Sequence, residues 1–458
     1  MTALARIPTG GPALDGLAAT GRLARLSHPD ASDLSHIGGK RGLPLVGVMP
    51  QILLDPARFS ARMGARHGRI YRFHALGRWH LHVVGAEALE RLLFDPARSF
   101  SAGEGWGPLV APLLPGALLL RDGEEHREHR RLMGEAFRQT AIEKYQLIFA
   151  DLVEQRIGRW QGRRIDAYEE ARRLTFEMAV LAFLGLSLGP EADRAMACFA
   201  RIAGGLLAIS YNPWLSLARH RGLAAKAELD RLLAGLVEAK RREPGEDFLS
   251  RVSLLRDGEG ALLGTSAISD MFIFLLVAAH DTMSSALCST LHFLAAHPDW
   301  AERLHDEQAD AQGPLHAMFF KECVRLNPPA PVVWRRALED VSFYGKTVPA
   351  GTMVGANLML HHRLENVWPQ PGRFDPSRFS PELERERHRF DFAPFGGGIH
   401  KCLGMHLAQS QAHSLARAVV ASSRLSSASN SPQGWYAWPS CRPRGRLLID
   451  VRRRSPGS

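Results

Sequence analysis

The sequence predicts one large, mainly helical domain with a small strand-rich region. Apolar residues recur at helical spacing through most segments from about 120 to 330. Stretches rich in β-branched and aromatic residues occur near 69–84 and 332–358. No Gly/Ser-rich or Pro-rich linker divides the middle of the 458-residue chain, so we expect residues 41–458 to form a single domain. Residues 1–40 are rich in Gly, Ala and Ser, and we expect a loosely ordered N-terminal extension there.

Composition argues against several classes of protein. The five cysteines are few, odd in number and widely spaced, with no CxxC pair, so a disulfide framework or a structural zinc site is not expected. The net charge is +10, but the charges are scattered and no nucleic-acid-binding signature is present. A solvated Arg-rich surface is the simplest interpretation, with an acidic partner protein next. There is no signal-peptide pattern and no run of about 18 apolar residues, so we expect a soluble cytoplasmic protein without a membrane anchor.

The first strand-rich stretch predicts a β-hairpin. Residues 69–75 and 79–84 are β-branched and aromatic, and Leu76-Gly77-Arg78 lies between them. Farther along the chain, the second strand-rich stretch contains turn signals at Tyr344-Gly345 and Pro349-Ala350-Gly351.

One long helix is predicted from Ser266 to about His297, and its apolar middle is interrupted by polar residues. The part from Met271 to Ala279 is apolar all round, as expected of a helix buried on every side. The hydroxyl of Thr282 can bond the carbonyl of Ala278 four residues back and open the helix beside a small bound molecule. Asp281 and Thr282 would then be placed to pass protons. The alternative is that both side chains face solvent or a polar neighbour.

Glu322 and Arg325 lie three residues apart on a predicted helix that Pro328-Pro329 ends. An exposed pair of this kind contributes only about 0.3–0.5 kcal/mol and is common. A buried pair has to find further partners, and Arg378 in the segment FDPSRF is a candidate.

The segment FGGGIHKC, from Phe395 to Cys402, carries the most specific signal. Glycines at 396, 397 and 398 allow the backbone to approach a bulky flat group. His400 precedes Cys402, and a helix is expected to begin there, which favours a thiolate able to bind a soft metal. The alternative is a buried, inert cysteine. The full pattern FxxGx[R/H]xCxG, which ends at Gly404, is expected by chance on the order of 10⁻⁴ times per chain at average residue usage.

On these motifs the chain resembles the cytochrome P-450 family of haem-thiolate monooxygenases over roughly residues 40–450. The resemblance implies a haem b buried between the long central helix and the cysteine loop. Cys402 would be the axial ligand of the haem iron, with Phe395 and Gly396 in the haem-binding loop. The family's oxygen-binding motif [A/G]Gx[D/E]T matches residues 278–282, with Ala279 where glycine is usual, which narrows the oxygen groove. Asp281 and Thr282 would be the catalytic acid–alcohol pair.

The resemblance assigns further roles. Glu322, Arg325 and Arg378 would form a structural cluster supporting the haem loop. Cations for the haem propionates are implied at four positions, with Arg336 left open as the alternative to Arg335: His126, Arg130, Arg335 and His400. The substrate pocket would include Ala278, Val332 and Val333, together with the segments 106–118 and 272–277, and residues 198–214 would form its roof.

The implied function is insertion of one oxygen atom from O2 into a hydrophobic small molecule, such as a terpenoid, steroid or fatty acid. Electrons would come from a ferredoxin and ferredoxin reductase, docking where Arg385, Arg387, Arg389 and Lys401 cluster, and we expect a monomer. A peroxygenase driven by hydrogen peroxide is the first alternative. A non-catalytic haem protein and a helical binding protein without haem are the others.

Overall fold

The structure, a computed structural model, describes residues 33–454 except 45, 135–136, 207–215, 257–259, 308–313, 429–433 and 438–439. It is 58% helical, with small sheets. Contacts between residues divide the described chain into two compact units. The first contains residues 101–145 and 176–280. The second contains the described residues of 28–100, 146–175 and 281–458.

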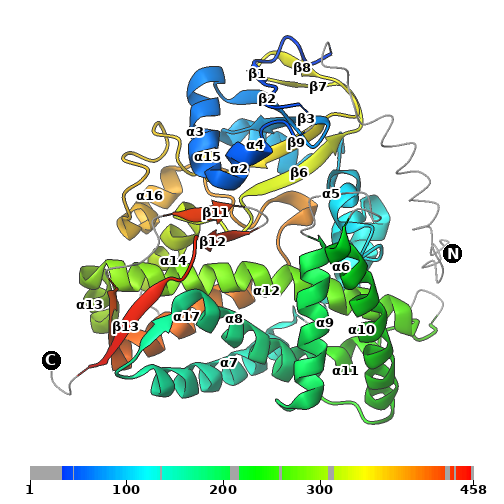
Figure 1. The fold of residues 1–458 in the computed structure, drawn as a ribbon, viewed down its shortest axis with the longest axis vertical. Helices are drawn as coiled ribbons and strands as arrows, with labels where there is room; N and C mark the ends of the chain where they lie inside the picture. The colour runs from blue at the N-terminus through cyan, green and yellow to red at the C-terminus, as the bar shows by residue number, and fades with distance from the viewer. Residues whose placement is uncertain are drawn as a thin grey trace. The chain divides into compact units, whose positions relative to one another are not determined.

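The second unit is built on a sheet with the strand order β1-β2-β3-β9-β6-β4. Its strands are β1 (Gly39–Lys40), β2 (Ile70–Ala75), β3 (Arg78–Val83), β9 (Met353–Asn357), β6 (Val332–Ala337) and β4 (Phe100–Ser101). The predicted hairpin is β2–β3, antiparallel with Ala75 opposite Arg78. Its two-residue turn places Leu76 and Gly77 at φ 51° and 79°, as a tight hairpin turn of this type requires. In Figure 1 these strands lie together in the upper part of the view, with α3 beside them.

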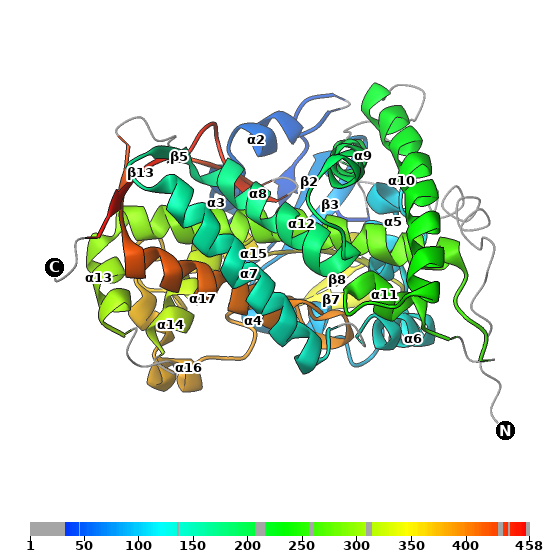
Figure 2. The same ribbon diagram turned by 90° about the horizontal axis from the view of Figure 1, so that it is seen from below.

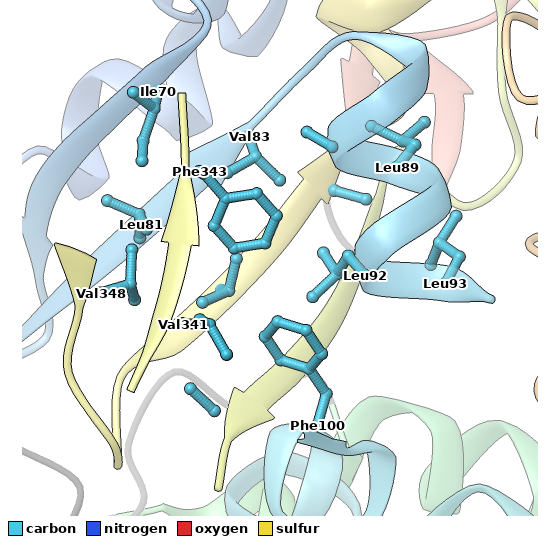
Figure 3. Close-up of a cluster of buried hydrophobic side chains, with 14 of the residues drawn as sticks. Ile70, Leu81, Val83, Leu89, Leu92, Leu93, Phe100, Val341, Phe343 and Val348 are labelled. Carbon is cyan, nitrogen blue, oxygen red and sulfur yellow. The ribbon is translucent and has the colours of Figure 1, made fainter. Parts of the chain in front are cut away.

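The core of this unit lies between the sheet and helix α4 (Ala86–Leu93). Leu89, Leu92 and Leu93 pack from α4 against side chains of the strands and of the hairpin β7–β8 (Val341–Phe343 and Lys346–Val348). Figure 3 shows Leu92 pointing from α4 toward Phe343. Burial of each such side chain contributes about 1.5–3 kcal/mol, so the cluster fixes α4 firmly on the sheet.

The second unit contains further helices, short helical turns and small sheets. Its helices and short helical turns are α2 (Met49–Leu54), α3 (Pro56–His67), α13 (Pro298–Asp306), α14 (Leu315–Leu326), α15 (Leu358–His361), η6 (Pro376–Phe379), α16 (Pro381–Glu386), η7 (Gly398–His400) and α17 (Met405–Ser422). Its smaller sheets contain β5 (Arg164–Asp166), β10 (Ser423–Ser427), β11 (Trp435–Ala437), β12 (Cys441–Pro443) and β13 (Leu448–Arg453).

The first unit is almost entirely helical. Its elements are α5 (Ala102–Val110), η1 (Leu118–Leu120), α6 (Gly123–Gly134), the π-helix η3 (Ala179–Leu184), α9 (Pro190–Leu206), α10 (Leu217–Arg242) and α11 (Phe248–Ser253). Helices α9 and α10 run side by side, as both views show (Figures 1 and 2). Helices α7 (Gln139–Trp160) and α8 (Ala167–Met178) contribute residues to both units.

Helix α12 (Thr265–Ala296) is the predicted long helix, uninterrupted through its polar middle. Residues up to His280 belong to the first unit, and residues from Asp281 onward belong to the second. The helix is long and apolar enough to span a membrane by length and composition alone. However, 61% of its most apolar window is buried within the protein, which is typical of a core helix.

Candidate active site

The cysteine loop is a tight turn that ends at the thiol of Cys402. The backbone N–H of Cys402 donates to the carbonyl oxygen of Phe395 at 2.9 Å and closes the turn. Gly396 and Gly398 have φ of 68° and 61°, the left-handed region that glycine adopts without strain. Helix α17 begins at Met405, three residues after Cys402.

The same glycines let the loop pack against the sheet core on one side. A Cβ atom at Gly397 would lie 2.5 Å from the ring of Phe390, and one at Gly398 would lie 2.4 Å from the carbonyl oxygen of Leu93. At Gly396, by contrast, the nearest atom is the carbonyl oxygen of His400 at 4.0 Å. The loop is therefore tightly packed at Gly397 and Gly398 and open at Gly396.

Glu322 and Arg325 form a completely buried ion pair on α14, each with 0% of its side chain exposed. Arg325 donates from Nε to one carboxylate oxygen of Glu322 at 2.6 Å and from Nη2 to the other at 2.8 Å. Nη1 donates to the carbonyl oxygens of His362 and Pro371, and Nη2 also donates to that of Arg373. A guanidinium has five N–H groups, so every one of them has an acceptor here.

Arg378 joins this pair, as the sequence predicts. Its Nε lies 3.6 Å from an oxygen of Glu322, and its Nη2 donates to the carbonyl of Gln370 at 3.1 Å. The backbone N–H of Asp375 donates to Glu322 at 2.8 Å. Arg325 and Arg387 also lie over the ring of Trp368, at 5.2 and 4.4 Å from its centroid. The structure thus brings the three predicted cluster residues together.

Two histidines that the sequence analysis did not single out connect this cluster to the cysteine loop. The ring of His362 accepts from the backbone N–H of Ala393 at 3.2 Å, while its carbonyl accepts from Arg325. The ring of His361 accepts from Gly85 at 3.0 Å and contacts the carbonyl of Phe390 at 2.8 Å. Burial lowers the pKa of His361 to about 4 and that of His362 well below its usual value, so both rings are neutral near pH 7 and can accept a hydrogen bond.

Strand β6 places its predicted residues on opposite faces of the sheet. Val333 packs with the core shared by α4, whereas Trp334 packs with Tyr71 and Phe73 on the other face. Side chains alternate along a strand, so Arg335 shares the face of Val333 and Arg336 shares that of Trp334. Both arginines are only 4% exposed.

Val332 lies on the Trp334 face. A Cβ atom at Gly355 would meet both Val332 and Trp334 within 3 Å, at 2.8 and 2.9 Å. Of the two predicted pocket valines, therefore, only Val333 shares a face with Arg335. The pocket role of each remains a prediction.

Asp281 and Thr282 sit on α12 as partly buried residues. Burial raises the pKa of the Asp281 carboxyl above its usual value, while the positive charges of Arg172 and Arg442 oppose that shift. Asp281 in turn helps to raise the pKa of Tyr168, after burial. The carboxyl is thus poised to hold a proton more readily than an ordinary aspartate, which suits a proton-transfer group.

In the first unit, α12 and α6 carry the other predicted residues. Ala278 is exposed although most residues from Met271 to Ala279 are buried, so the helix surface is open at that point. On α6, His126 is 1% exposed and Arg130 is partly buried.

Segment 106–118 contains most of α5, and residues 198–206 lie on α9. The rest of the predicted roof, 207–214, is outside the described residues.

Three of the four arginines and lysines expected to dock an electron donor have partners within the protein. Arg389 pairs with Glu90. Arg387 donates to the carbonyl of Arg378 and is partly buried over Trp368. Arg385, Arg389 and Lys401 are all exposed, and Arg385 donates from Nε to the carbonyl of Pro381.

The donor set fits a haem. Cys402 is the exposed cysteine of the five, whereas the other four are buried. A soft thiolate is a suitable iron ligand. The open side of the glycine turn at Gly396 suits a flat group, and Arg335 is a buried cation of the kind that neutralises a carboxylate.

Comparisons with known proteins all give the same family. The cytochrome P450 family model matches residues 37–429. A putative cytochrome P450 136 of Mycobacterium tuberculosis is 30% identical over 399 residues, 82% of this chain and 80% of the relative. Cytochrome P450 26B1 of Homo sapiens is 28% identical over 418 residues, 84% and 81% of the two chains. The solved structure of retinoic acid bound cyanobacterial CYP120A1 has a TM-score of 0.82 at 26% identity, covering 91% of this chain and 99% of that one.

Proposed function

The chain belongs to the cytochrome P450 family, and on that premise we propose that it hydroxylates a hydrophobic small molecule with electrons delivered by a ferredoxin. Family membership makes the protein a haem-thiolate monooxygenase with haem b as cofactor. The observation that carries the proposal is the exposed thiol of Cys402, which lies at the end of a glycine turn and three residues before α17. Within this proposal the protein is a cytoplasmic monomer.

The residues of the chain take distinct roles in the reaction. Cys402 would hold the haem iron, and Arg335, His126, Arg130 and His400 would neutralise the propionates. Bound haem supplies the activation of dioxygen and the oxidation of a C–H bond. The Asp281 carboxyl would hold a proton, as its raised pKa favours, and the Thr282 hydroxyl would pass that proton on.

The substrate is proposed to be apolar and of small-molecule size. Val333, the segment 106–118 and the apolar part of α12 from Phe272 to Val277 are suited to such a ligand. One solved relative is described with retinoic acid bound, an apolar polyene that carries one carboxylate. A terpenoid, steroid or fatty-acid-like molecule therefore stays the preferred class, with retinoic acid a reasonable first compound to test.

The electron donor is proposed to be an acidic ferredoxin that approaches Lys401 and Arg385. Rim charges of this kind act mainly on the rate of association and lose their effect at high salt. Lys401→Glu should therefore slow reduction by a ferredoxin at low ionic strength by about tenfold or less. Arg389→Glu, which also removes an internal partner of Glu90, is a less direct probe.

The acid–alcohol pair favours a monooxygenase over a peroxygenase. Hydrogen peroxide already carries the protons and electrons that Asp281 and Thr282 would help to deliver, so a peroxygenase has no need of them. Turnover with peroxide, together with none from any ferredoxin and reductase, would favour the alternative.

A carbon monoxide difference spectrum of the reduced protein tests the assignment. We expect the red-shifted Soret band of a thiolate-ligated haem in the wild type and its loss in Cys402→Ala. Cys198→Ala, which removes a buried cysteine of the first unit, should retain the band. A wild-type protein that takes up no haem, or a Cys402→Ala variant that keeps the band, would overturn the proposal. If the band is present in the wild type, a screen of hydrophobic compounds for a shift in the spin state of the haem iron would identify the substrate class.

A further inference from the structure

Residues 101–122 form a loop whose two ends are joined by one carboxylate. Asp122 accepts from the hydroxyl of Ser101 at 2.5 Å and from the backbone N–H groups of Ala102 and Gly103 at 3.0 and 3.1 Å. Ala102 and Asp122 are 20 residues apart in the chain. The carboxylate therefore closes the loop through three hydrogen bonds to its other end.

The same contacts anchor α5, the helix inside this loop. Ala102 and Gly103 are its first residues, so their N–H groups would otherwise lack acceptors within the helix. The Ser101 hydroxyl, held by Asp122, accepts in turn from the N–H of Glu104 at 2.8 Å. A carboxylate at a helix N-terminus is also favoured by the helix dipole.

The loop is held close to the start of α6 as well. The backbone carbonyl of Asp122 accepts from the N–H of His126 at 3.2 Å, so Asp122 is the residue from which α6 begins. A Cβ atom at Gly103 would lie 2.4 Å from the carbonyl oxygen of Leu120, which shows how closely the two ends of the loop approach. One residue thus fixes α5, which lies in the expected substrate wall, to α6, which carries His126 and Arg130.

We propose that Asp122 is a positioning residue for substrate selection: it holds α5 and the wall segment 106–118 in the register that recognises a bulky ligand. The inference rests on the proposed function. Closing a loop of this length in advance removes an ordering penalty that ligand binding would otherwise carry. Small ligands that do not reach the wall gain nothing from this closure, whereas bulky ones do.

The test uses two azoles on the holoprotein, since both bind haem iron but differ in size. Imidazole is small, and clotrimazole carries three aryl rings that, on the proposed function, would meet the segment 106–118. In Asp122→Ala we expect the dissociation constant of imidazole to stay within about twofold and that of clotrimazole to rise about tenfold or more, because three hydrogen bonds to a charged group are lost. Asp122→Asn keeps one acceptor oxygen, so its dissociation constant for clotrimazole should lie between those of the wild type and Asp122→Ala.

Asp247→Ala is the matched control within the same unit. Asp247 also accepts three hydrogen bonds, two from Ser250 and one from Lys240, at the start of α11. Its loss perturbs a helix start comparably but should leave the ratio of the two azole affinities unchanged. The proposal would be overturned if the ratio of the clotrimazole and imidazole dissociation constants were unchanged in Asp122→Ala. It would also be overturned if Asp247→Ala changed that ratio as much as Asp122→Ala does.

Hydrogen exchange of the α5 amides provides a readout that needs no haem. Asp122→Ala should accelerate exchange in residues 102–110 by about tenfold or more, with little change in α10 or α11. Unchanged exchange would overturn the proposal. If the wild type bound neither azole, the proposed function would fail, and exchange would still decide whether Asp122 closes the loop.

Discussion

Arg325 uses all five of its guanidinium N–H groups inside the protein, and Glu322 accepts two of them. The other three go to backbone carbonyls at 362, 371 and 373. The pair is therefore a fixed junction at which α14 holds two distant stretches of backbone. One of these stretches leads through His362 to Ala393, just before the cysteine loop.

Glu322→Ala should destabilise the protein by about 3–5 kcal/mol, because it leaves Arg325 as an uncompensated buried charge. The free energy of unfolding from urea titration measures this directly, and haem content should fall with it. Lys321→Ala is the control on the same helix, because Lys321 pairs with Glu384 at a partly exposed site. That change should alter stability by less than about 1 kcal/mol. Equal effects of the two substitutions would contradict the structural role of the cluster.

The stability of the protein should fall as pH drops from about 6.5 toward 4, in part through His361. Its pKa is lowered from 6.5 to about 4 in the folded chain, chiefly by burial, with Asp391 opposing. Between these values the unfolded chain binds the proton and the folded chain does not, so acid favours unfolding. His292 and His413, whose pKa values are also lowered to about 4, share this slope. His361→Gln should therefore reduce the slope of stability against pH only in part. Midpoints of urea unfolding measured between pH 4 and 6.5 test this. An unchanged slope would contradict the role of His361.

Gly398→Ala should prevent the cysteine loop from forming correctly. The added Cβ would lie 2.4 Å from the carbonyl oxygen of Leu93, at a φ of 61° that alanine rarely adopts. Gly77 has a similar φ of 79°, but an added Cβ atom there would have no other atom within 4 Å. Gly77→Ala therefore measures the backbone strain alone, roughly 1–2 kcal/mol. Haem content and melting temperature of the two variants separate the effects. Haem incorporation lost equally in both would show that strain alone, not the contact with Leu93, is decisive.

Thr282→Val should divert electrons from product to hydrogen peroxide, because the hydroxyl proposed to pass a proton is replaced by a methyl group of similar size. The measurement is the ratio of product formed to electron donor consumed, with peroxide quantified in parallel. Thr290→Val is the control two turns along the same helix, where the hydroxyl donates to the carbonyl of Ala286 at 3.0 Å. That variant should couple electrons to product as the wild type does.

Asp281→Asn should slow turnover but stabilise the protein at neutral pH. The folded chain holds the Asp281 carboxyl at a raised pKa, so its ionised form is disfavoured relative to the unfolded chain. This penalty is present above the folded pKa and disappears as pH falls below the ordinary value of 3.8. The gain in melting temperature should therefore be seen at pH 7 and shrink in acid. A variant less stable than wild type at pH 7 would show that Arg172 and Arg442 outweigh burial.

The mainly helical fold, the long α12 and the β2–β3 hairpin were predictable because each depends on local periodicity and turn residues. The cysteine loop was predictable because its glycines, histidine and cysteine are adjacent in the chain. His361, His362 and Asp122 were missed because a lone histidine pair or an aspartate before a helix has no distinctive pattern. Their partners lie up to 276 residues away, as for Gly85 and His361. A helix cap at Asp122 could have been suspected, but not its contact with Ser101.

Sequence alone determined the chemistry that position 402 can support and predicted the acid–alcohol pair, because both depend on side-chain type and short spacing. Tertiary structure decided which charges are buried, which arginine of β6 faces the same side as Val333, and which cations near the cysteine loop remain accessible. These properties depend on desolvation and on partners brought together by folding, and neither can be read from residues that are neighbours in the chain.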